Sequence, residues 1–306
     1  GEIEEFYSIT GALVAPESAD NPFKYKFSWS PKGVVKAGNN SARYLKDSKE
    51  VNIPSKDLFK RTFHQTFSEI GQLEVYANRD SINYIDIYDI PETKTIYRGT
   101  FRHPGWCESI DALKELNLIS EAPINLKGKT YAGLIAEQIG ASDLSDIKKK
   151  TADYLNVPED AHAIKSLEWL GLFDDKPISR EKDSPFEVTS DLMLQKMILG
   201  KKERDMVVMQ HTFLTKFPNK EKEKEVIRSS MRVYGSPDTD TSVARTVALP
   251  AAIAVKLILE GKIQLEGVYR PVIPEIYKPV LEELEDIGIK LEEEYGLSQD
   301  QNIELP

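Results

Sequence analysis

The stretch TKTIYRGTFR, residues 93–102, has the β-branched and aromatic content of a strand, and the rest of the chain is arranged around it. Side chains alternate between the two faces of a strand, so Arg98, Thr100 and Arg102 share one surface. Tyr97 and its alternate neighbours share the other. The stretch therefore predicts a strand that presents two guanidinium groups and a hydroxyl together.

A second arginine follows a neighbouring strand. Residues 71–77 alternate apolar and polar side chains, which predicts a half-buried strand that ends at Asn78-Arg79-Asp80. Functional residues often lie where strands end, and the planar fork of arginine matches a carboxylate. We interpret Arg79 with Arg98 and Arg102 as an anion-binding pocket. Ordinary solvated arginines or weak surface ion pairs are the alternative, and the residues alone leave both open.

The fold class predicted from the pattern is α/β (α+β), with a mixed β-sheet and helices in separate blocks. Residues 1–108 and 200–240 are expected to form the mixed-sheet part. Helical spacing of apolar residues predicts an all-helical insert over 109–199. Residues 220–225 are charged and predict the solvated turn of a hairpin, and 241–306 are expected to form C-terminal helices.

Two segments outside these strands have distinctive patterns. Residues 3–15 predict a strand that leads into a turn at Gly11. Tyr25, Phe27 and Trp29 alternate with polar residues, which predicts an extended segment with three aromatic rings on one face. Packing in the core is the more usual role for such rings, and ligand contact is the alternative.

The alanine-rich stretch after residue 240 predicts a long helix. Thr241 or Ser242 can cap its N-terminus, Gly261 can end it, and Pro250 lies inside it. Its small side chains favour close packing against another element.

Composition excludes several classes of function. The formal net charge of −10 disfavours nucleic acid, which is bound through an excess of Lys and Arg. Cys107 is the single cysteine, so neither an intramolecular disulfide nor a thiolate metal cluster is possible, and the scattered histidines predict no metal site. We expect apolar runs well short of a membrane span, no membrane partner and an intracellular protein.

The ordered segments together resemble one family, the glutamate-forming saccharopine dehydrogenases, also called saccharopine reductases. The resemblance spans almost the whole chain and is carried by residues 15–17, 21–22, 25–30, 78–80, 98–102, 168–172, 205–209, 246–250 and 275–277.

This resemblance implies an oxidoreductase of lysine metabolism that uses NAD or NADP. The family interconverts saccharopine with glutamate and 2-aminoadipate 6-semialdehyde, by hydride transfer at a secondary amine through an imine. Saccharopine carries three carboxylates, which agrees with the anion pocket. By position, the resemblance implies these substrate-binding residues: Arg79, Thr100, the Phe101 backbone, Arg102 and Phe27. It also implies that Trp29 contacts the cofactor and forms, with Phe27, the wall between substrate and nicotinamide.

The family begins with a nucleotide-binding Rossmann half, and this sequence contains no G-x-G-x-x-G followed by a ribose-binding acid. The resemblance therefore implies the substrate-binding part of a longer enzyme, with catalytic groups in an N-terminal half and with 241–306 packed on that half. It also implies a homodimer that is cytoplasmic, or in the mitochondrial matrix for an animal-type bifunctional parent. A non-catalytic binding or assembly protein that retains the fold is the alternative.

Two local departures affect the site. Thr10 stands where the family usually has a cysteine, so a thiol role at this position is in question. His103 stands where a tyrosine is common, which puts the stacking contact of that ring in question.

Overall fold

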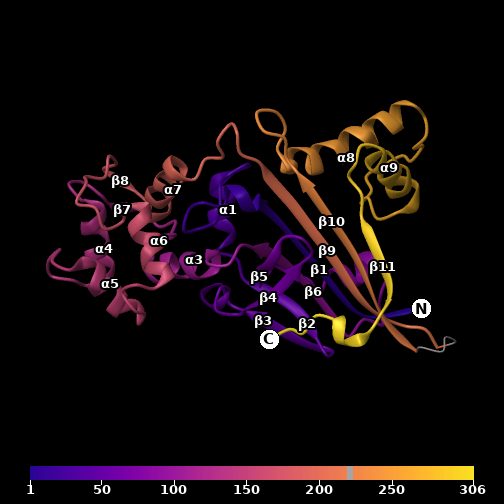
Figure 1. Ribbon diagram of the computed structural model, residues 1–306, viewed down its shortest axis with the longest axis horizontal. Helices are drawn as coiled ribbons and strands as arrows, with labels where there is room; N and C mark the ends of the chain where they lie inside the picture. The colour runs from indigo at the N-terminus through magenta and orange to yellow at the C-terminus, as the bar shows by residue number, and fades with distance from the viewer. Residues whose placement is uncertain (219–222) are drawn as a thin grey trace.

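A mixed β-sheet forms the centre of the protein in a computed structural model that describes residues 1–218 and 223–306 (Figure 1). Nine of the described strands belong to this sheet, and seven of them follow the order β11-β10-β9-β1-β6-β2-β3. The antiparallel pair β4 and β5 is attached through β5 to β6. The strands are β1 (Glu2–Val14), β2 (Ala42–Lys46), β3 (Lys49–Ile53), β4 (Thr62–Phe67), β5 (Gly71–Ala77), β6 (Thr95–Arg102), β9 (Asp205–Lys216), β10 (Lys224–Tyr234) and β11 (Glu292–Leu297).

The first strand and the arginine-bearing strand lie side by side in the middle of the sheet. β1 pairs with β6 in parallel, Thr10 opposite Thr100, and with β9 in the antiparallel direction. β10 and β11 extend the sheet by antiparallel pairing. This arrangement confirms the predicted class, a mixed sheet with several helices. The predicted hairpin is β9 and β10, and residues 220–222 of its predicted turn lie outside the described residues.

Gly11 does not form the predicted turn, because β1 continues through it to Val14. A Cβ at Gly11 would lie 2.7 Å from the Cβ of Phe101 and 2.8 Å from its carbonyl oxygen. The glycine is therefore required for the close approach of β1 and β6. A side chain there would separate the two central strands.

Helices lie between strands of the first part of the sheet and over much of the chain between β6 and β9. They are α1 (Pro31–Ala37), α2 (Tyr84–Tyr88), α3 (Trp106–Glu115), α4 (Tyr131–Ile139), α5 (Ile147–Leu155), α6 (His162–Leu170) and α7 (Pro185–Lys196). Short 3₁₀ turns lie at Pro16–Ser18, Ser55–Asp57 and Gln299–Gln301. The helical segment also contains a two-stranded ladder, β7 (Ile124–Asn125) with β8 (Lys182–Asp183), which the helical spacing did not predict.

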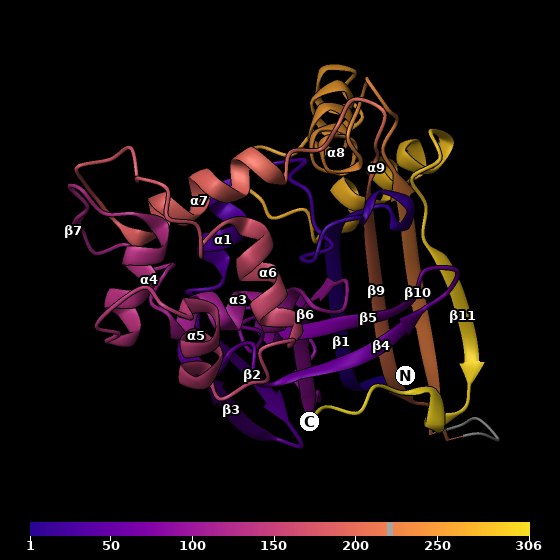
Figure 2. The ribbon, with the colours of Figure 1, turned by 60° about the vertical axis from the view of Figure 1, so that its left-hand side comes forward.

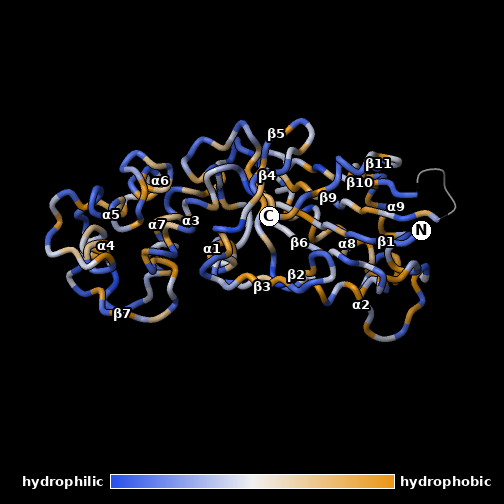
Figure 3. The backbone as a smooth tube through the Cα atoms, turned by 90° about the horizontal axis from the view of Figure 1, so that it is seen from below, coloured by the Kyte–Doolittle hydropathy of each residue, from blue (hydrophilic) through white to orange (hydrophobic). Residues whose placement is uncertain are grey.

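The helices α3 to α7 lie at one end of an elongated molecule, and β9, β10 and β11 lie at the other (Figures 2 and 3). One buried apolar cluster nevertheless runs through both parts, from Leu13 and Phe101 in the sheet to Leu134 and Leu167 in the helices. The helical end is therefore packed onto the sheet through a shared core.

The C-terminal helices α8 (Ser242–Leu259) and α9 (Pro274–Asp286) cover the β9–β10 region of the sheet (Figure 1). Thr241 caps α8, because its hydroxyl accepts a hydrogen bond from the N–H of Ala244 at 3.0 Å. Pro250 lies inside the helix, as predicted. The chain then forms β11, a strand that the sequence pattern did not predict.

Much of α8 is apolar and exposed. Val247 is 69% exposed and Leu259 is 83% exposed. By length and composition α8 could cross a membrane, with 18 residues, a mean hydropathy of 1.7 and 17% of the window buried. This corrects the expectation that apolar runs fall well short of a span. A single helix of this kind is weak evidence for a membrane protein, and its first turns line the pocket described below.

Candidate functional site

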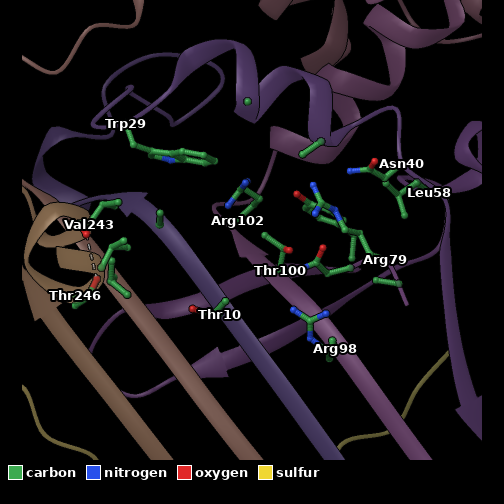
Figure 4. Close-up of a pocket in the computed structure, with 18 of the residues that line it drawn as sticks. Thr10, Trp29, Asn40, Leu58, Arg79, Arg98, Thr100, Arg102, Val243 and Thr246 are labelled. Carbon is green, nitrogen blue, oxygen red and sulfur yellow. Dashed lines mark hydrogen bonds between the residues drawn. The ribbon is translucent and has the colours of Figure 1, made fainter. Parts of the chain in front are cut away.

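The predicted arginines meet at a cavity of about 590 Å³ on one face of the sheet (Figure 4). Strands β1, β5, β6 and β9 form its floor, and the segments that carry Trp29 and Asn40 rise around it. Val243, Thr246 and Val247 of α8 close one side. The volume is in the range of pockets that bury small molecules.

Arg102 is the buried member of the group, with only 4% of its surface exposed. Its Nη1 donates to the carbonyl oxygen of Phe101 at 3.0 Å, and its Nε has no hydrogen-bond partner among the described residues. Among the described residues, no aspartate or glutamate forms a salt bridge with Arg102. A buried, unpaired guanidinium is costly, and an anion bound in the cavity would remove much of that cost.

Aromatic rings surround this guanidinium. Its carbon lies 5.4 Å from the ring centre of Tyr25, 5.8 Å from that of Tyr76 and 5.4 Å from that of Trp106. Cation–π attraction at such distances partly offsets the lost hydration. The rings also exclude water, which strengthens the field that the cation presents to a ligand.

Arg79 is exposed and projects toward the cavity from the turn after β5 (Figure 4). Its backbone adopts a left-handed conformation with φ 53, which is uncommon for a residue with a side chain. The turn is held in place because the Arg43 N–H donates to the carbonyl oxygen of Arg79 at 2.9 Å. The neighbouring Asp80 pairs with the Arg43 guanidinium at 2.7 Å. The turn therefore fixes the direction in which Arg79 points.

Arg98 lines the same cavity and also supports the turn. Its guanidinium lies 4.3 Å from the ring centre of Tyr84 and donates to the carbonyl oxygen of Asp80 at 3.4 Å. Its backbone N–H donates to the Ser81 hydroxyl at 2.9 Å. Arg98 thus joins the central strand to the segment that carries Arg79.

The charge of this cavity is opposite to that of the whole protein. The three arginines line it, and none of its described lining residues is an aspartate or glutamate. The sequence as a whole has a net charge of −10. A local positive field of this kind selects anionic small molecules.

The other residues predicted to bind substrate lie in different surroundings. Thr100 lines the cavity, as expected from its place between two arginines. The Phe101 side chain is fully buried on the opposite face of β6, against Phe67 at 5.9 Å. Its carbonyl oxygen is occupied by Arg102.

Phe27 is not among the residues that line the cavity. It lies in the core, with its ring 5.6 Å from that of Tyr25. The segment around it is irregular, because its single ladder contact is an isolated bridge to Ile198. The alternation of three aromatic residues therefore did not produce the predicted strand with three rings on one face.

Trp29 does line the cavity, and it is 38% exposed. Its indole N–H donates to the Tyr25 hydroxyl at 3.1 Å, which sets the orientation of the ring. Figure 4 shows the indole on the same side of the cavity as Val243 and Thr246 of α8. The indole therefore presents a flat aromatic surface at the edge of the cavity.

The two departures from the family pattern have structural roles. The Thr10 hydroxyl donates to the carbonyl oxygen of Val208 at 3.1 Å, across to β9, and the residue lines the cavity. His103 is buried, and one ring nitrogen lies 2.9 Å from the carbonyl oxygen of Val14. Burial lowers the pKa of this histidine.

Several residues of the site were not predicted. Tyr76 alternates with the apolar residues of β5, but it is buried and lies beside Arg102. Trp106 belongs to the arginine-bearing stretch predicted as an anion site, but its place beside the Arg102 guanidinium depends on where α3 begins. Val243 and Thr246 come from a helix remote in sequence. The sequence contains no local signal for such a contact.

Residues 1–289 match the family model described as the saccharopine dehydrogenase C-terminal domain. The chain belongs to this family. A solved structure of apo histidine-tagged saccharopine dehydrogenase (L-Glu forming) from Saccharomyces cerevisiae superposes with a TM-score of 0.86 and 32% identity, over 96% of this chain and 67% of that chain.

Curated members and relatives of the family have similar identities. The saccharopine dehydrogenase [NADP(+), L-glutamate-forming] of Schizosaccharomyces pombe is 35% identical over 96% of this chain and 67% of its own length. The mitochondrial alpha-aminoadipic semialdehyde synthase of Mus musculus is 35% identical over 94% of this chain and 31% of its own length. The chain thus spans about two thirds of the fungal relative and about a third of the animal one.

The resemblance to saccharopine dehydrogenases is therefore confirmed at the level of the family. The fungal names give NADP(+) as the cofactor of those enzymes, and the mouse name gives a mitochondrial location. The roles of the individual site residues remain predictions of this structure.

Proposed function

We propose that this chain is the substrate-binding part of a saccharopine dehydrogenase, and that its cavity binds saccharopine by the carboxylates. The buried guanidinium of Arg102 is the observation that carries the proposal, because no salt bridge joins it to a carboxylate among the described residues. Saccharopine has three carboxylates and the cavity has three arginines. Thr100, between Arg98 and Arg102 on β6, adds a hydroxyl to the same surface.

The lining residues bind and orient a ligand, and they supply little acid–base chemistry near neutral pH. The described lining set includes no histidine, lysine, cysteine or carboxylate. Its ionisable members are the arginines and two tyrosines, Tyr76 and Tyr84. Groups that transfer protons to or from the substrate amine would then come from elsewhere in the enzyme.

A nicotinamide cofactor would act as the hydride acceptor of the whole enzyme. Trp29 is the residue of this chain that fits a place beside its ring, since the exposed indole lies at the edge of the cavity. The described chain offers no glycine-rich phosphate loop for the rest of the dinucleotide. We propose that the remaining part of the protein binds it and packs on the exposed face of α8.

Calorimetric titration of the chain with saccharopine tests the proposal. Binding should be detectable, should weaken as salt rises and should be absent for lysine, which lacks the glutarate carboxylates. Failure to bind saccharopine at millimolar concentration would contradict the function assigned to the cavity.

A non-catalytic binding or assembly protein is the second candidate, and the lack of a proton-transfer group among the described lining residues favours it. The two candidates differ in whether the completed protein oxidises saccharopine. Saccharopine and NADP(+) should give no reduced cofactor with residues 1–306 alone, and should give it once a nucleotide-binding half from a relative is supplied. Binding without turnover in the completed protein would favour the second candidate.

The proposed assembly is a homodimer, with a cytoplasmic location or a mitochondrial one for an animal-type parent. Sedimentation equilibrium measures the oligomeric state, and microscopy of a tagged full-length protein shows its location in the cell. A monomer at micromolar concentration would contradict the dimer.

A further inference from the structure

Glu74 on β5 lies directly opposite Arg102 on β6, yet the two side chains do not form an ion pair. The register pairs these residues in an antiparallel ladder. Residues in this relation share a face, and opposite charges there normally attract. Among the described residues, however, no salt bridge joins them, and the guanidinium remains without a carboxylate.

The Glu74 carboxylate is bound instead to the N-terminus of α3. It accepts the N–H of Gly105 at 2.9 Å and the N–H of Cys107 at 3.1 Å. Gly105 is the N-cap residue, with φ 102, and has no side chain to satisfy these donors. A carboxylate is favoured at a helix N-terminus, so a neighbouring strand supplies the cap.

This cap also determines the surroundings of Arg102. The carboxylate bonds on either side of Trp106, whose ring centre lies 5.4 Å from the guanidinium carbon. These hydrogen bonds therefore fix Trp106 beside the Arg102 guanidinium. They also bind the Glu74 carboxylate, which is then not available to pair with Arg102.

Arg79, the exposed arginine of the pocket, shows the same arrangement. Asp80 directly follows Arg79, and its two oxygens are bound by the Arg43 guanidinium at 2.7 Å and by the Ile82 N–H at 2.8 Å. No ion pair joins Asp80 to Arg79 in the described part of the chain. At both sites, the carboxylate adjacent to the arginine in register or in sequence is held by another partner.

We propose that Glu74 and Asp80 are positioning residues whose carboxylates are held by other groups, which leaves the pocket arginines free for the substrate. This inference rests on the proposed function, because it assigns roles within the same site. It predicts that releasing either carboxylate creates an internal competitor for the ligand.

Two substitutions at position 74 test the first half of the proposal. Glu74→Asp keeps the charge opposite Arg102, but it is one methylene too short to reach both N–H groups. Glu74→Gln keeps the length and removes the charge. We expect Glu74→Asp to raise the Kd for saccharopine about tenfold and Glu74→Gln to change it less than about threefold.

A purely structural cap gives the opposite order, because Glu74→Asp retains the negative charge that α3 favours and would be the milder change. Equal binding by Glu74→Asp and the wild type, or a larger loss in Glu74→Gln, would overturn the proposal. Thermal unfolding of each variant separates changes in stability from changes in affinity.

Arg43→Met tests the second half at a partly exposed position, where folding is less at risk. This substitution removes the guanidinium that binds Asp80, beside Arg79, and should raise the Kd for saccharopine about threefold or more. Arg43→Lys keeps a positive charge at this position and should bind saccharopine as the wild type does. Unchanged binding in Arg43→Met overturns this half.

NMR of the arginine Nε–H groups distinguishes failure of this inference from failure of the proposed function. In Glu74→Asp, the Arg102 signal should shift without any ligand. If wild-type protein does not bind saccharopine but this signal shifts, the proposed function fails and the positioning role stands. If saccharopine binds and the signal does not move, the positioning role fails alone.

Discussion

At the scale of single residues, the site depends on one cation that is buried at a cost. Arg102 has 4% of its surface exposed and no carboxylate partner among the described residues. Three aromatic rings reduce the cost without neutralising the charge. Such a group is better suited to binding an anion than to stabilising the fold.

Arg102→Met should separate these two effects. We expect binding of saccharopine to fall by about 2–4 kcal/mol, because a carboxylate loses its partner. The free energy of unfolding should stay the same or rise, since a similar volume is filled without a buried charge. Calorimetry and urea unfolding measure the two quantities, with Arg270→Met, at an exposed position, as the control. A loss of stability that parallels the loss of binding would contradict this interpretation.

His211 links protonation to stability. Burial lowers its pKa from the ordinary value of 6.5, so the folded protein holds this ring neutral where the unfolded chain binds a proton. Stability contributed by the neutral ring is therefore lost as the pH falls below about 6.5. Urea unfolding of the wild type should show this loss between pH 7 and pH 5. His211→Phe should reduce the slope, with His103 contributing to what remains; an identical slope in the variant would contradict the assignment.

At the scale of elements, the packing of β1 on β6 depends on Gly11. A Cβ there would lie 2.7 Å from the Cβ of Phe101. Gly11→Ala should lower the free energy of unfolding by about 1–3 kcal/mol, because a methyl group must be accommodated between two paired strands. Chemical denaturation measures the change. Full stability in Gly11→Ala would show that the two strands can separate without cost.

The N-cap of α8 is the second element-scale test. Thr241→Ala removes the hydroxyl that accepts the Ala244 N–H, and should cost about 1 kcal/mol of stability. Thr241→Ser keeps the hydroxyl and should remain close to the wild type. If both variants lose the same stability, the methyl group and not the cap is responsible.

The sequence predicted elements well where one face is buried and the other is polar. Strand β5 follows from such alternation, whereas β6 was predicted from its β-branched and aromatic content and the hairpin β9–β10 from its charged turn. β11 was not predicted, because Glu292, Glu293 and Glu294 precede its tyrosine and no apolar face is present. It pairs through its backbone with β10, and that pairing leaves no periodic signal.

Some of the predicted site residues lie at the cavity for a related reason. Strand periodicity placed Arg98, Thr100 and Arg102 on one surface, and all three line the cavity. The same rule failed for Phe27, because residues around it form an irregular segment. The contributions of Trp106 and Val243 arise from packing between elements, which sequence spacing does not determine.

At the scale of the whole molecule, one large core joins the sheet to the helical end, and Cys107 is buried within it. Burial raises the pKa of its thiol well above the ordinary value. Labelling by a thiol reagent at pH 8 should therefore proceed only through unfolding of this core. The rate should follow the denaturant dependence of global unfolding measured by circular dichroism. Rapid labelling of the native protein would show that the core opens locally.

The position of β1 in the sheet has a consequence for the order of folding. The first strand of this sequence occupies the centre, and its Thr10 hydroxyl bonds to Val208, which is 198 residues further along. During synthesis, both edges of β1 are made long before β9 is available to cover one of them. The sheet must therefore close late and across a long loop, which favours slow folding and a need for protection of the nascent chain.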